Sequence, residues 1–568
     1  MWGFRDTEFA LNAGGHVTVR GSRYELSGQE LPRFLPWVRE VLGIALDPAD
    51  VNVSRYPTAI SAARANGRFV EHLRGLLKPD QIETEGEVRL RHGHGHTQEE
   101  MYGIKYGRLS RIPDMVVYPE TEAQVQGLVQ AAVAHDVALI PYGGGTNVTD
   151  ALRCHESETR MIVSVDMHRM NRVLWLDREN MKAAIEAGAV GRDIVAELQH
   201  HGVTMGHEPD SIEFSTLGGW IATNASGMKK NRYGNIEDLV LDVTVVTAGG
   251  ILRRTAAAPR ESVGLDVRRM LFGSEGTLGI VTSAVVKIFP LPEVQEYDSV
   301  LFRTFEEGFA FVRAVARETT PPASVRLMDN LQFQFGLALK PRSRGLGRAK
   351  SALEKFVVTR VKGFAPDRMV ACTLVFEGAR EEVRRQRHDV RRLAARHGGM
   401  RAGRENGRRG YQLTYSIAYI RDFLMPYYII AESFETSVSW SDTLALCDNV
   451  KRVLHEEYAR RGLPGKPFVS ARVTQVYPSG VCVYFYFGFS YKGVTNPQEI
   501  YLELENLART EILRSGGSLS HHHGVGKLRR RFLPEIMSDE ALRWKRELKR
   551  ALDPTDVFGA GNQGLDAR

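Results

Sequence analysis

Three adjacent histidines, His521, His522 and His523, lie between flexible, glycine-containing segments near the C-terminal end of the chain. Imidazole is the side chain whose ordinary pKa lies nearest neutral pH. Such a run therefore suits proton transfer, anion recognition or metal binding.

Two of the plainer explanations for this run are not favoured. It is internal and only three residues long, which argues against a purification tag. A metal site is not expected, because neighbouring residues of an extended segment point to opposite faces. The same alternation predicts that His522 points away from its two neighbours. His92, His94 and His96 do share a face, but no carboxylate or cysteine cluster joins them.

Length and composition indicate a soluble, globular protein. A chain of 568 residues is too long for one hydrophobic core and predicts two or three domains. No apolar run is long enough to predict a transmembrane helix. The four cysteines are scattered without metal-binding or redox spacing, which favours a reducing compartment.

The net charge of +7 favours anionic partners without naming one. Nucleic acid is not expected, because interleaved stacking aromatics and a recognisable nucleic-acid module are both absent from the sequence. An anionic membrane surface or a phosphorylated substrate would explain the same charge.

The elements that position a site begin after residue 110. Residues 1–110 carry no recognisable site and are predicted to form an N-terminal helical segment. The spacing then predicts a strand at 115–118, a helix at 121–135 capped by Thr121, and a strand at 138–141. This pattern leads directly into three consecutive glycines.

Gly143, Gly144 and Gly145 could let backbone N–H groups approach an anion closely, because no Cβ atom blocks access. A plain glycine turn is the alternative. Three further segments with a similar character follow at 209–219, 223–227 and 273–280.

These four segments, in this order, resemble the FAD-binding domain of the vanillyl-alcohol-oxidase (p-cresol methylhydroxylase) flavoprotein family. The resemblance implies that loops wrap the cofactor. No histidine lies in the glycine loop, so FAD is expected to be bound non-covalently. The implied cofactor-binding residues are Pro141, Tyr142, Gly143, Gly144, Gly145, Thr146, Asn147, Asp210, Ser211, Ile212, Glu213, Phe214, Ser215, Thr216, Thr223, Asn224, Ala225, Ser226, Glu275, Gly276, Thr277, Leu278, Gly279, Ile280 and Val281.

The second half of the chain narrows the resemblance. Segments 322–330, 410–422 and 481–487, together with the histidine run, are similar to the alkyldihydroxyacetonephosphate synthases of that superfamily, and the similarity extends from Trp2 to Gly559. The implied fold is α+β: a two-subdomain FAD-binding domain at 111–294, an α+β cap domain at 295–510 and a C-terminal segment at 511–568 that returns to the FAD domain.

The resemblance also implies a reaction. Enzymes of this family replace the acyl chain of acyl-dihydroxyacetone phosphate with a long-chain fatty alcohol, which forms the ether bond of ether lipids and plasmalogens. A covalent adduct between flavin and substrate is implied, without net redox change. This chemistry requires proton removal beside a ketone and cations for phosphate and the leaving carboxylate.

Five residues match the family's catalytic positions. Tyr484 corresponds to the proton-transfer tyrosine, and period-two alternation places it on one strand face with Cys482 and Tyr486. Arg326 corresponds to a residue important for activity. His521, His522 and His523 correspond to the histidine run, of which at least one is expected to contact phosphate or move a proton. Tyr484 could instead be a core aromatic, and Arg326 could form a structural ion pair with Asp329.

Arg421 corresponds to the family's substrate-binding residue, and its guanidinium suits phosphate or carboxylate. A surface salt bridge with Asp422 is the alternative. His207, beside Glu208, lies in the second loop and is interpreted as a neighbour of the site and not as its base.

Two other functions stay open at this stage. One is an FAD-dependent 2-hydroxyacid dehydrogenase or phenol oxidase of the same superfamily, and the other is a flavin-bearing membrane protein without catalysis. The resemblance implies a peroxisomal, membrane-associated homodimer. However, the sequence shows neither the N-terminal nor the SKL-type C-terminal peroxisomal signal. A bacterial protein would be cytoplasmic.

Overall fold

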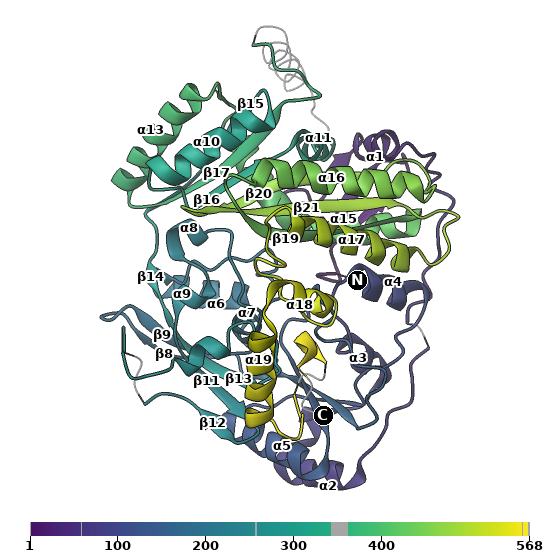
Figure 1. Cartoon of the computed structure of the whole chain (residues 1–568), viewed down its shortest axis with the longest axis vertical. Coiled ribbons are helices and arrows are strands. Elements are labelled where there is room, and N and C mark those ends of the chain that lie inside the picture. The colour runs from purple at the N-terminus through teal and green to yellow at the C-terminus, as the bar shows by residue number, and fades with distance from the viewer. Residues whose placement is uncertain (1, 58, 256–257, 342–361, 559–560, 566–568) are drawn as a thin grey trace. The chain divides into compact units, whose positions relative to one another are not determined.

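The computed structural model describes residues 2–57, 59–255, 258–341, 362–558 and 561–565 (Figure 1). The chain forms two compact units. Unit 1 comprises Met1–Ser54 and Pro292–Ser518, and unit 2 comprises Arg55–Leu291 and Leu519–Arg568. Each unit is therefore built from two separate stretches of sequence.

Unit 2 contains a four-stranded and a five-stranded sheet. In the first, of order β4-β5-β7-β6, strands β5 and β6 both pair with β7 in parallel. The second, of order β12-β11-β13-β9-β8, is antiparallel. The helices and strands are α2 (Gly67–Leu76), β4 (Ile82–Glu83), α3 (Gly86–Arg91), α4 (Gln98–Tyr106), β5 (Met115–Val117), α5 (Glu122–His135), β6 (Ala138–Tyr142), β7 (Ile162–Asp166), β8 (Val173–Asp177), β9 (Lys182–Glu186), α6 (Gly191–His200), β10 (Val203–Thr204), α7 (Leu217–Thr223), α8 (Lys230–Tyr233), α9 (Ile236–Leu239), β11 (Val240–Thr247), β12 (Gly250–Leu252), β13 (Ile280–Lys287), β14 (Phe289–Pro290), α18 (Leu533–Ile536) and α19 (Asp539–Leu552).

The predicted strand, helix and strand before the glycine loop are confirmed as β5, α5 and β6. Thr121 caps α5 by accepting a hydrogen bond from Gln124 N–H at 3.2 Å. The C-terminal segment packs into the same core, since Leu139 N–H of β6 donates to the carbonyl oxygen of Val557 at 2.7 Å. This contact fixes the strand that leads into the glycine loop.

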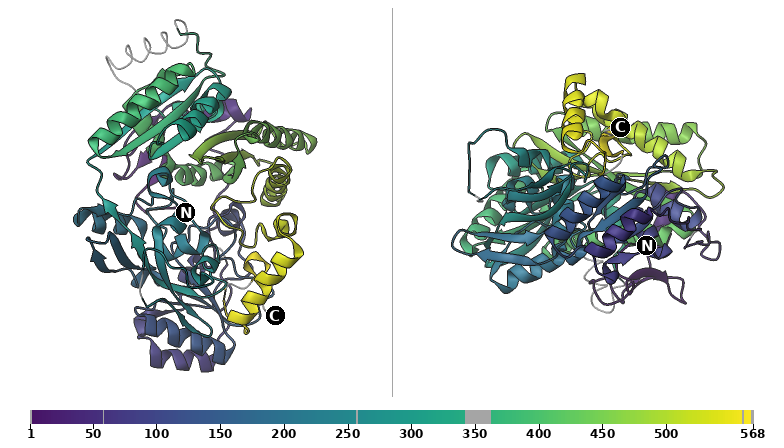
Figure 2. Two further views of the ribbon diagram at one scale, coloured as in Figure 1. Left: turned by 60° about the vertical axis from the view of Figure 1, so that its left-hand side comes forward. Right: turned by 90° about the horizontal axis from the view of Figure 1, so that it is seen from below.

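Unit 1 is organised around a seven-stranded antiparallel sheet of order β18-β15-β17-β16-β20-β21-β19. Its helices and strands are β1 (Glu8–Leu11), β2 (Val17–Arg20), β3 (Glu30–Leu31), α1 (Phe34–Leu42), β15 (Val294–Phe302), α10 (Phe305–Glu318), β16 (Ser324–Met328), α11 (Asn330–Ala338), β17 (Val370–Gly378), α13 (Arg380–Arg396), β18 (Met400–Arg401), α14 (Arg404–Gln412), α15 (Ile417–Leu424), β19 (Ile429–Ser439), α16 (Thr443–Arg460), β20 (Phe468–Val476), β21 (Gly480–Ser490) and α17 (Pro497–Arg514). Figure 2 shows α10 and α13 lying along this sheet.

The two faces of this sheet have different character. Phe487 of β21 packs against Tyr501 of α17 with ring centroids 5.1 Å apart, and Leu327 of β16 lies on the same face beside α10. The opposite face carries Arg326 and Tyr484. The strand predicted at 481–487 is thus confirmed, together with the alternation of its side chains.

The N-terminal segment differs from the helical segment predicted at 1–110. Residues 1–54 belong to unit 1 and residues 55–110 to unit 2, and the chain begins with the three-stranded antiparallel sheet β1-β2-β3. These strands are only two to four residues long, which is too short for a clear period-two signal.

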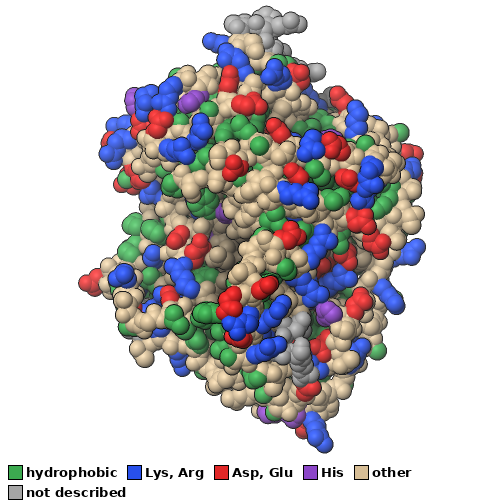
Figure 3. Space-filling view, in the orientation of Figure 1, with side chains coloured by type: hydrophobic (Ala, Val, Ile, Leu, Met, Phe, Trp, Pro, Cys, Tyr) green, Lys and Arg blue, Asp and Glu red, His purple; other side chains and the backbone are tan. Residues whose placement is uncertain are grey.

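Among the described residues, no helix is both long and apolar enough to cross a membrane. Lys and Arg side chains are interspersed with Asp and Glu over the face drawn in Figure 3, so the basic excess does not gather into one patch there.

Candidate active site

The glycine loop after β6 lies directly against the second predicted loop. A Cβ atom added to Gly143 would lie 2.4 Å from Thr216 Oγ1, and one added to Gly144 would lie 2.1 Å from the carbonyl oxygen of Phe214. Gly145 has a φ of 66°, in the left-handed region that favours glycine. Close packing against the second loop therefore explains Gly143 and Gly144, and the left-handed conformation explains Gly145.

The third and fourth predicted loops come to the same place in unit 2. Glu275 N–H donates to the carbonyl oxygen of Ala222 at 2.8 Å, and a Cβ atom on Gly276 would lie 3.2 Å from Pro141 Cγ. Asn224 ends α7 in the left-handed conformation, with a φ of 53°. All four segments that the sequence selected are thus neighbours.

The polar atoms of these loops fit the cofactor that the sequence implies. Asn147 Nδ2 and Asn224 Oδ1 are buried without a hydrogen-bond partner among the described residues. Leaving such an atom unpaired costs about 1–3 kcal/mol, which marks both atoms as places for a ligand's polar groups. One atom donates and the other accepts, which suits the phosphate oxygens, carbonyls and ring N–H of FAD, and the glycines leave the backbone open to it.

Glu275 joins the fourth loop to the histidine run. Its carboxylate accepts hydrogen bonds from the N–H groups of Val525 (2.5 Å) and Gly526 (2.8 Å), directly after the run. A Cβ atom on Gly524 would lie 2.3 Å from Glu275 Oε1. Burial raises the pKa of Glu275, although these backbone hydrogen bonds oppose the shift. The carboxylate of this predicted cofactor-binding residue is thus directed at the histidine loop.

Lys527 anchors the far end of this loop. Its Nζ donates to the carbonyl oxygens of Asp150 (3.3 Å) and Ala151 (3.2 Å) and to Asn562 Oδ1 (2.6 Å). Burial lowers the pKa of Lys527 to about 8. In the sequence, only the position of Lys527 after a glycine-rich turn could have indicated this role.

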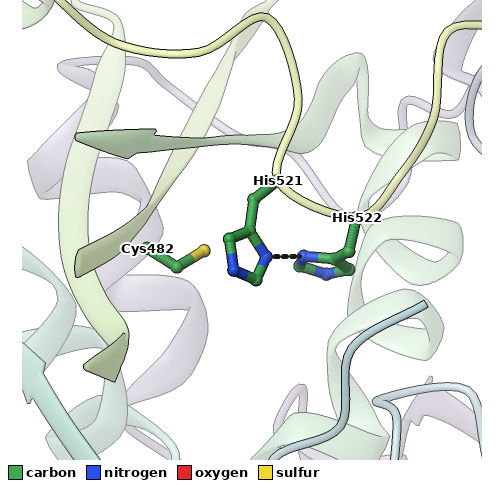
Figure 4. A group of neighbouring side chains, drawn as sticks. All are labelled: Cys482, His521 and His522. Carbon is green, nitrogen blue, oxygen red and sulfur yellow. Dashed lines mark hydrogen bonds between the residues drawn. The ribbon is translucent and has the colours of Figure 1, made fainter. Parts of the chain in front are cut away.

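The three histidines lie in a bent segment and not in an extended one. The Nδ1 atoms of His521 and His522 are 2.7 Å apart, so one imidazole donates a hydrogen bond to the other (Figure 4). The ring centroids of His522 and His523 are 4.7 Å apart. The prediction that His522 points away from its neighbours is therefore wrong, because alternation applies to extended chain. This hydrogen bond makes the first two imidazoles a candidate proton relay.

His207 is a further imidazole of unit 2, and it is buried against Trp220 with ring centroids 4.7 Å apart. Neither ring nitrogen has a hydrogen-bond partner among the described residues. Burial lowers the pKa of His207 to about 3, and the nearby His522 acts in the same direction. His207 is therefore uncharged at neutral pH, and its interpretation as a neighbour of the site stays a prediction.

Arg326 lies on the buried, polar side of the sheet in unit 1. Its Nη1 donates to Thr414 Oγ1 at 2.7 Å, and its guanidinium lies 5.6 Å from the ring centroid of Tyr411. Asp329, the ion-pair partner that the sequence offered as an alternative, accepts a hydrogen bond from Lys451 Nζ at 2.7 Å. The alternative is thus less favoured, and the role of Arg326 in activity stays a prediction.

Arg421 lies on α15 and forms the salt bridge with Asp422 that the sequence offered as an alternative, at 3.1 Å. The pair is not a surface contact, because the two side chains are only 10% and 8% exposed. Asp422 Oδ2 also accepts a hydrogen bond from Trp2 N–H at 2.6 Å. The N-terminal segment therefore holds the carboxylate that orients Arg421.

Tyr484 is buried on β21, on the same face of the sheet as Arg326 and Cys482. The guanidinium of Arg472, on the neighbouring strand β20, lies 4.9 Å from the centroid of its ring. Sequence reasoning missed Arg472, because cross-strand neighbours depend on register. The role of Tyr484 in proton transfer stays a prediction.

The start of the histidine segment is tied to β19. Ser518, the last residue of unit 1, accepts a hydrogen bond from Ser437 N–H at 2.9 Å and lies 2.9 Å from the Ser437 hydroxyl. Ser437 pairs with Cys482 of β21. Within unit 1, Ser518 therefore lies beside the strand next to the one that carries Tyr484.

Comparisons with known proteins agree with this arrangement. A family model for an FAD binding domain matches residues 113–256, and one for the C-terminal domain of FAD linked oxidases matches residues 291–562. The chain is 44% identical to the alkyldihydroxyacetonephosphate synthase of Caenorhabditis elegans over 564 residues, which are 99% of this chain and 94% of the relative.

Solved structures give the same picture. A structure of alkyldihydroxyacetonephosphate synthase superimposes with a TM-score of 0.86 at 29% identity, and the match covers 98% of this chain and 97% of the other. A p-cresol methylhydroxylase structure matches with a TM-score of 0.67 at 16% identity over 89% of this chain and 99% of the other, which supports the fold alone. The predicted fold class, with its FAD-binding domain of the vanillyl-alcohol-oxidase type, is thus confirmed.

Proposed function

This chain belongs to the FAD-dependent alkyldihydroxyacetonephosphate synthase family, and on that premise we propose that it exchanges the acyl chain of acyl-dihydroxyacetone phosphate for a long-chain fatty alcohol. The union of the four cofactor loops with the histidine run through Glu275 supports this function most directly.

The cofactor and the chain have separate tasks in this proposal. Bound non-covalently in the four loops, FAD would supply a centre that holds the reacting carbon after the carboxylate leaves and before the alcohol arrives. The side chains move the proton and balance the charges. Because the FAD is bound non-covalently in this proposal, acid precipitation should release all of the flavin into the supernatant.

Tyr484 and the histidine run are the groups for proton transfer. The exchange removes a proton from the carbon beside the ketone and later returns one, which a phenol or an imidazole can do. Tyr484 is buried on the sheet, and the hydrogen-bonded imidazoles of His521 and His522 supply a second acid–base group.

Arg421 and Arg326 are the cationic groups for the anions of this reaction. A guanidinium binds phosphate or carboxylate through two parallel N–H groups. Both side chains are held by neighbours, Arg421 by Asp422 and Arg326 by Thr414. Such fixed cations lose little freedom when an anion binds.

The function is tested by product analysis with the FAD-loaded protein, palmitoyl-dihydroxyacetone phosphate and hexadecanol. Palmitate release should equal alkyl-dihydroxyacetone phosphate formation, and an added redox dye should stay oxidised. Tyr484→Phe should lose ether formation and keep its flavin spectrum. Dye reduction without ether formation would instead indicate a dehydrogenase or oxidase, and activity unaffected by Tyr484→Phe would remove that residue from the reaction.

Three further features are proposed from family membership: a peroxisomal location, peripheral contact with a membrane, and assembly as a homodimer. The membrane contact is supported by the net charge of +7 and by the nature of the substrates. Fatty alcohols and acyl chains are apolar, so a membrane-facing entry would deliver them without passage through water.

A further inference from the structure

Three ionisable side chains form a row across β20, β21 and β19, the three strands at one end of the sheet in unit 1. The register places Glu435 of β19 directly opposite Tyr484 of β21, and Tyr484 directly opposite Arg472 of β20. Residues opposite each other in antiparallel strands share one face, with Cβ atoms about 4.5–5.5 Å apart. The phenol therefore stands between a carboxylate and a guanidinium.

All three members of this row are buried. Glu435 is 0% exposed, Tyr484 is 6% exposed and Arg472 is 7% exposed. Burial of an ionised group is unfavourable unless charge or hydrogen bonding compensates for it. A carboxylate and a guanidinium kept in the same buried row therefore act on each other and on the phenol between them, and they act more strongly than they would in water.

Arg472 also fixes the ring of Tyr484. Its guanidinium lies 4.9 Å from the centroid of Tyr484 and 5.0 Å from that of Tyr486, two residues along on the same face. A cation over aromatic rings at this distance is attracted to both. Arg472 thus holds the phenol in place and puts a positive charge beside it.

We infer that Arg472 and Glu435 are positioning residues that set the proton affinity of Tyr484, with Arg472 favouring the phenolate and Glu435 favouring the phenol. The inference rests on the proposed role of Tyr484. The phenolate takes the proton from the carbon beside the ketone, and the resulting phenol returns one later in the turnover. No proton is gained or lost overall, and opposite neighbours keep both forms accessible.

Other groups of unit 1 also face this part of the sheet. Tyr486 and Cys482 flank Tyr484 on its own strand, Arg326 comes from β16, and Tyr411 comes from α14, which packs over the same face. Within the row, only Glu435 and Arg472 are paired directly with Tyr484. Removing either one should therefore change Tyr484 more than any change among the others.

The test is the pH dependence of the exchange rate in FAD-loaded variants. Replacing Arg472 by Gln removes the cation, so the alkaline rise in rate should move to higher pH by about one to three units. Glu435→Gln removes the like charge and should move the rise to lower pH by about one unit or more. Arg472→Lys keeps the charge and should leave the rise near its wild-type position, at a reduced rate, because the planar stacking is lost.

Glu505→Gln is the matched control, since Glu505 forms a buried pair with Arg509 on α17 at 2.6 Å. It should lower the melting temperature and leave the pH profile in place. An independent readout is the tyrosinate absorbance of wild type minus that of Tyr484→Phe, which isolates one tyrosine of 19. That transition should move in the same directions as the rate.

The outcomes separate two failures. Full activity in Tyr484→Phe would overturn the proposed role of Tyr484 itself. An inactive Tyr484→Phe combined with unchanged profiles in Glu435→Gln and Arg472→Gln, or with shifts in the same direction for these two variants, would overturn only this inference. If Arg472→Gln does not fold, Glu435→Gln decides alone. An unchanged pH dependence of its exchange rate would then overturn the inference.

Discussion

At the scale of single residues, Glu275 links cofactor binding to the histidine run. Its two carboxylate oxygens accept hydrogen bonds from the backbone that follows the histidines. Nothing in the sequence indicated which groups the Glu275 carboxylate binds, because residues 275 and 525 meet only in the folded unit. The resemblance could mark the position of Glu275, whereas the structure was needed to say what its carboxylate binds.

Glu275→Ala should therefore uncouple the run from the cofactor loops. One buried and one partly buried backbone N–H group would lose their acceptor. Each loss costs up to about 1–3 kcal/mol, so the exchange rate per bound flavin should fall at least about tenfold. The control is Glu186→Ala, which removes another buried carboxylate that binds Arg172 N–H at 2.8 Å. It should lower the melting temperature alone. Equal rates per flavin in the two variants would contradict the link.

A second residue-scale prediction concerns Glu100, which is completely buried and accepts a hydrogen bond from Gly95 N–H at 2.9 Å. Burial, followed by the charge of Asp150, raises the pKa of Glu100 from 4.5 to about 8. A pKa raised on folding contributes stability that is present below the unfolded value and is lost as pH rises through the folded value.

The melting temperature of the wild type should thus decline between about pH 4.5 and pH 8. Glu100→Gln cannot ionise, so its decline should be shallower over the same range. Thermal unfolding of both proteins across this range is the measurement, and parallel curves would mean that Glu100 does not titrate there.

At the scale of elements, the sequence predicted local structure well and long-range pairing poorly. The segment from β5 to the glycine loop and the alternation along β21 follow periods of two and 3.6 residues, which a sequence displays directly. The position of Arg472 opposite Tyr484 depends on register across two strands. The bend at the histidines lies next to backbone that Glu275 binds, a contact between segments far apart in sequence. The sequence therefore could not show that the histidine run is bent, and the prediction from an extended segment was wrong.

The glycine loop allows a prediction at this scale. Gly144→Ala would place a Cβ atom 2.1 Å from the carbonyl oxygen of Phe214, so the first two loops should separate and the purified protein should lose most of its flavin absorbance. Gly75→Ala is the control. It lies in α2 with nothing within 4 Å of the added atom, and the change should raise stability by up to about 1 kcal/mol. Retained flavin in Gly144→Ala would contradict the cradle.

At the scale of the whole molecule, family membership explains features that no single residue displays. The chain matches its relatives along nearly its full length. Both units, each built from two separate stretches of sequence, are therefore part of the family's fold. Composition alone indicated a soluble protein with anionic partners. It could not indicate that residues 1–54 pack with the second half of the chain, because that packing joins segments far apart in sequence.

The proposed membrane contact is testable with the intact protein. The net charge of +7 should cause sedimentation with vesicles of anionic phospholipid, and added salt should weaken this binding because it screens surface charge. Vesicles of zwitterionic lipid serve as the control. Equal binding to both vesicle types would assign the contact to apolar groups, and no binding to either would contradict membrane association.

The central claim is that this chain forms an ether bond by exchange, and the origin of the ether oxygen tests it most directly. Hexadecanol labelled with heavy oxygen is incubated with the FAD-loaded protein and palmitoyl-dihydroxyacetone phosphate. The masses of both products are then measured by mass spectrometry. The account predicts that the label appears in the ether product and that palmitate leaves unlabelled. A labelled palmitate, or an ether product without the label, would contradict it.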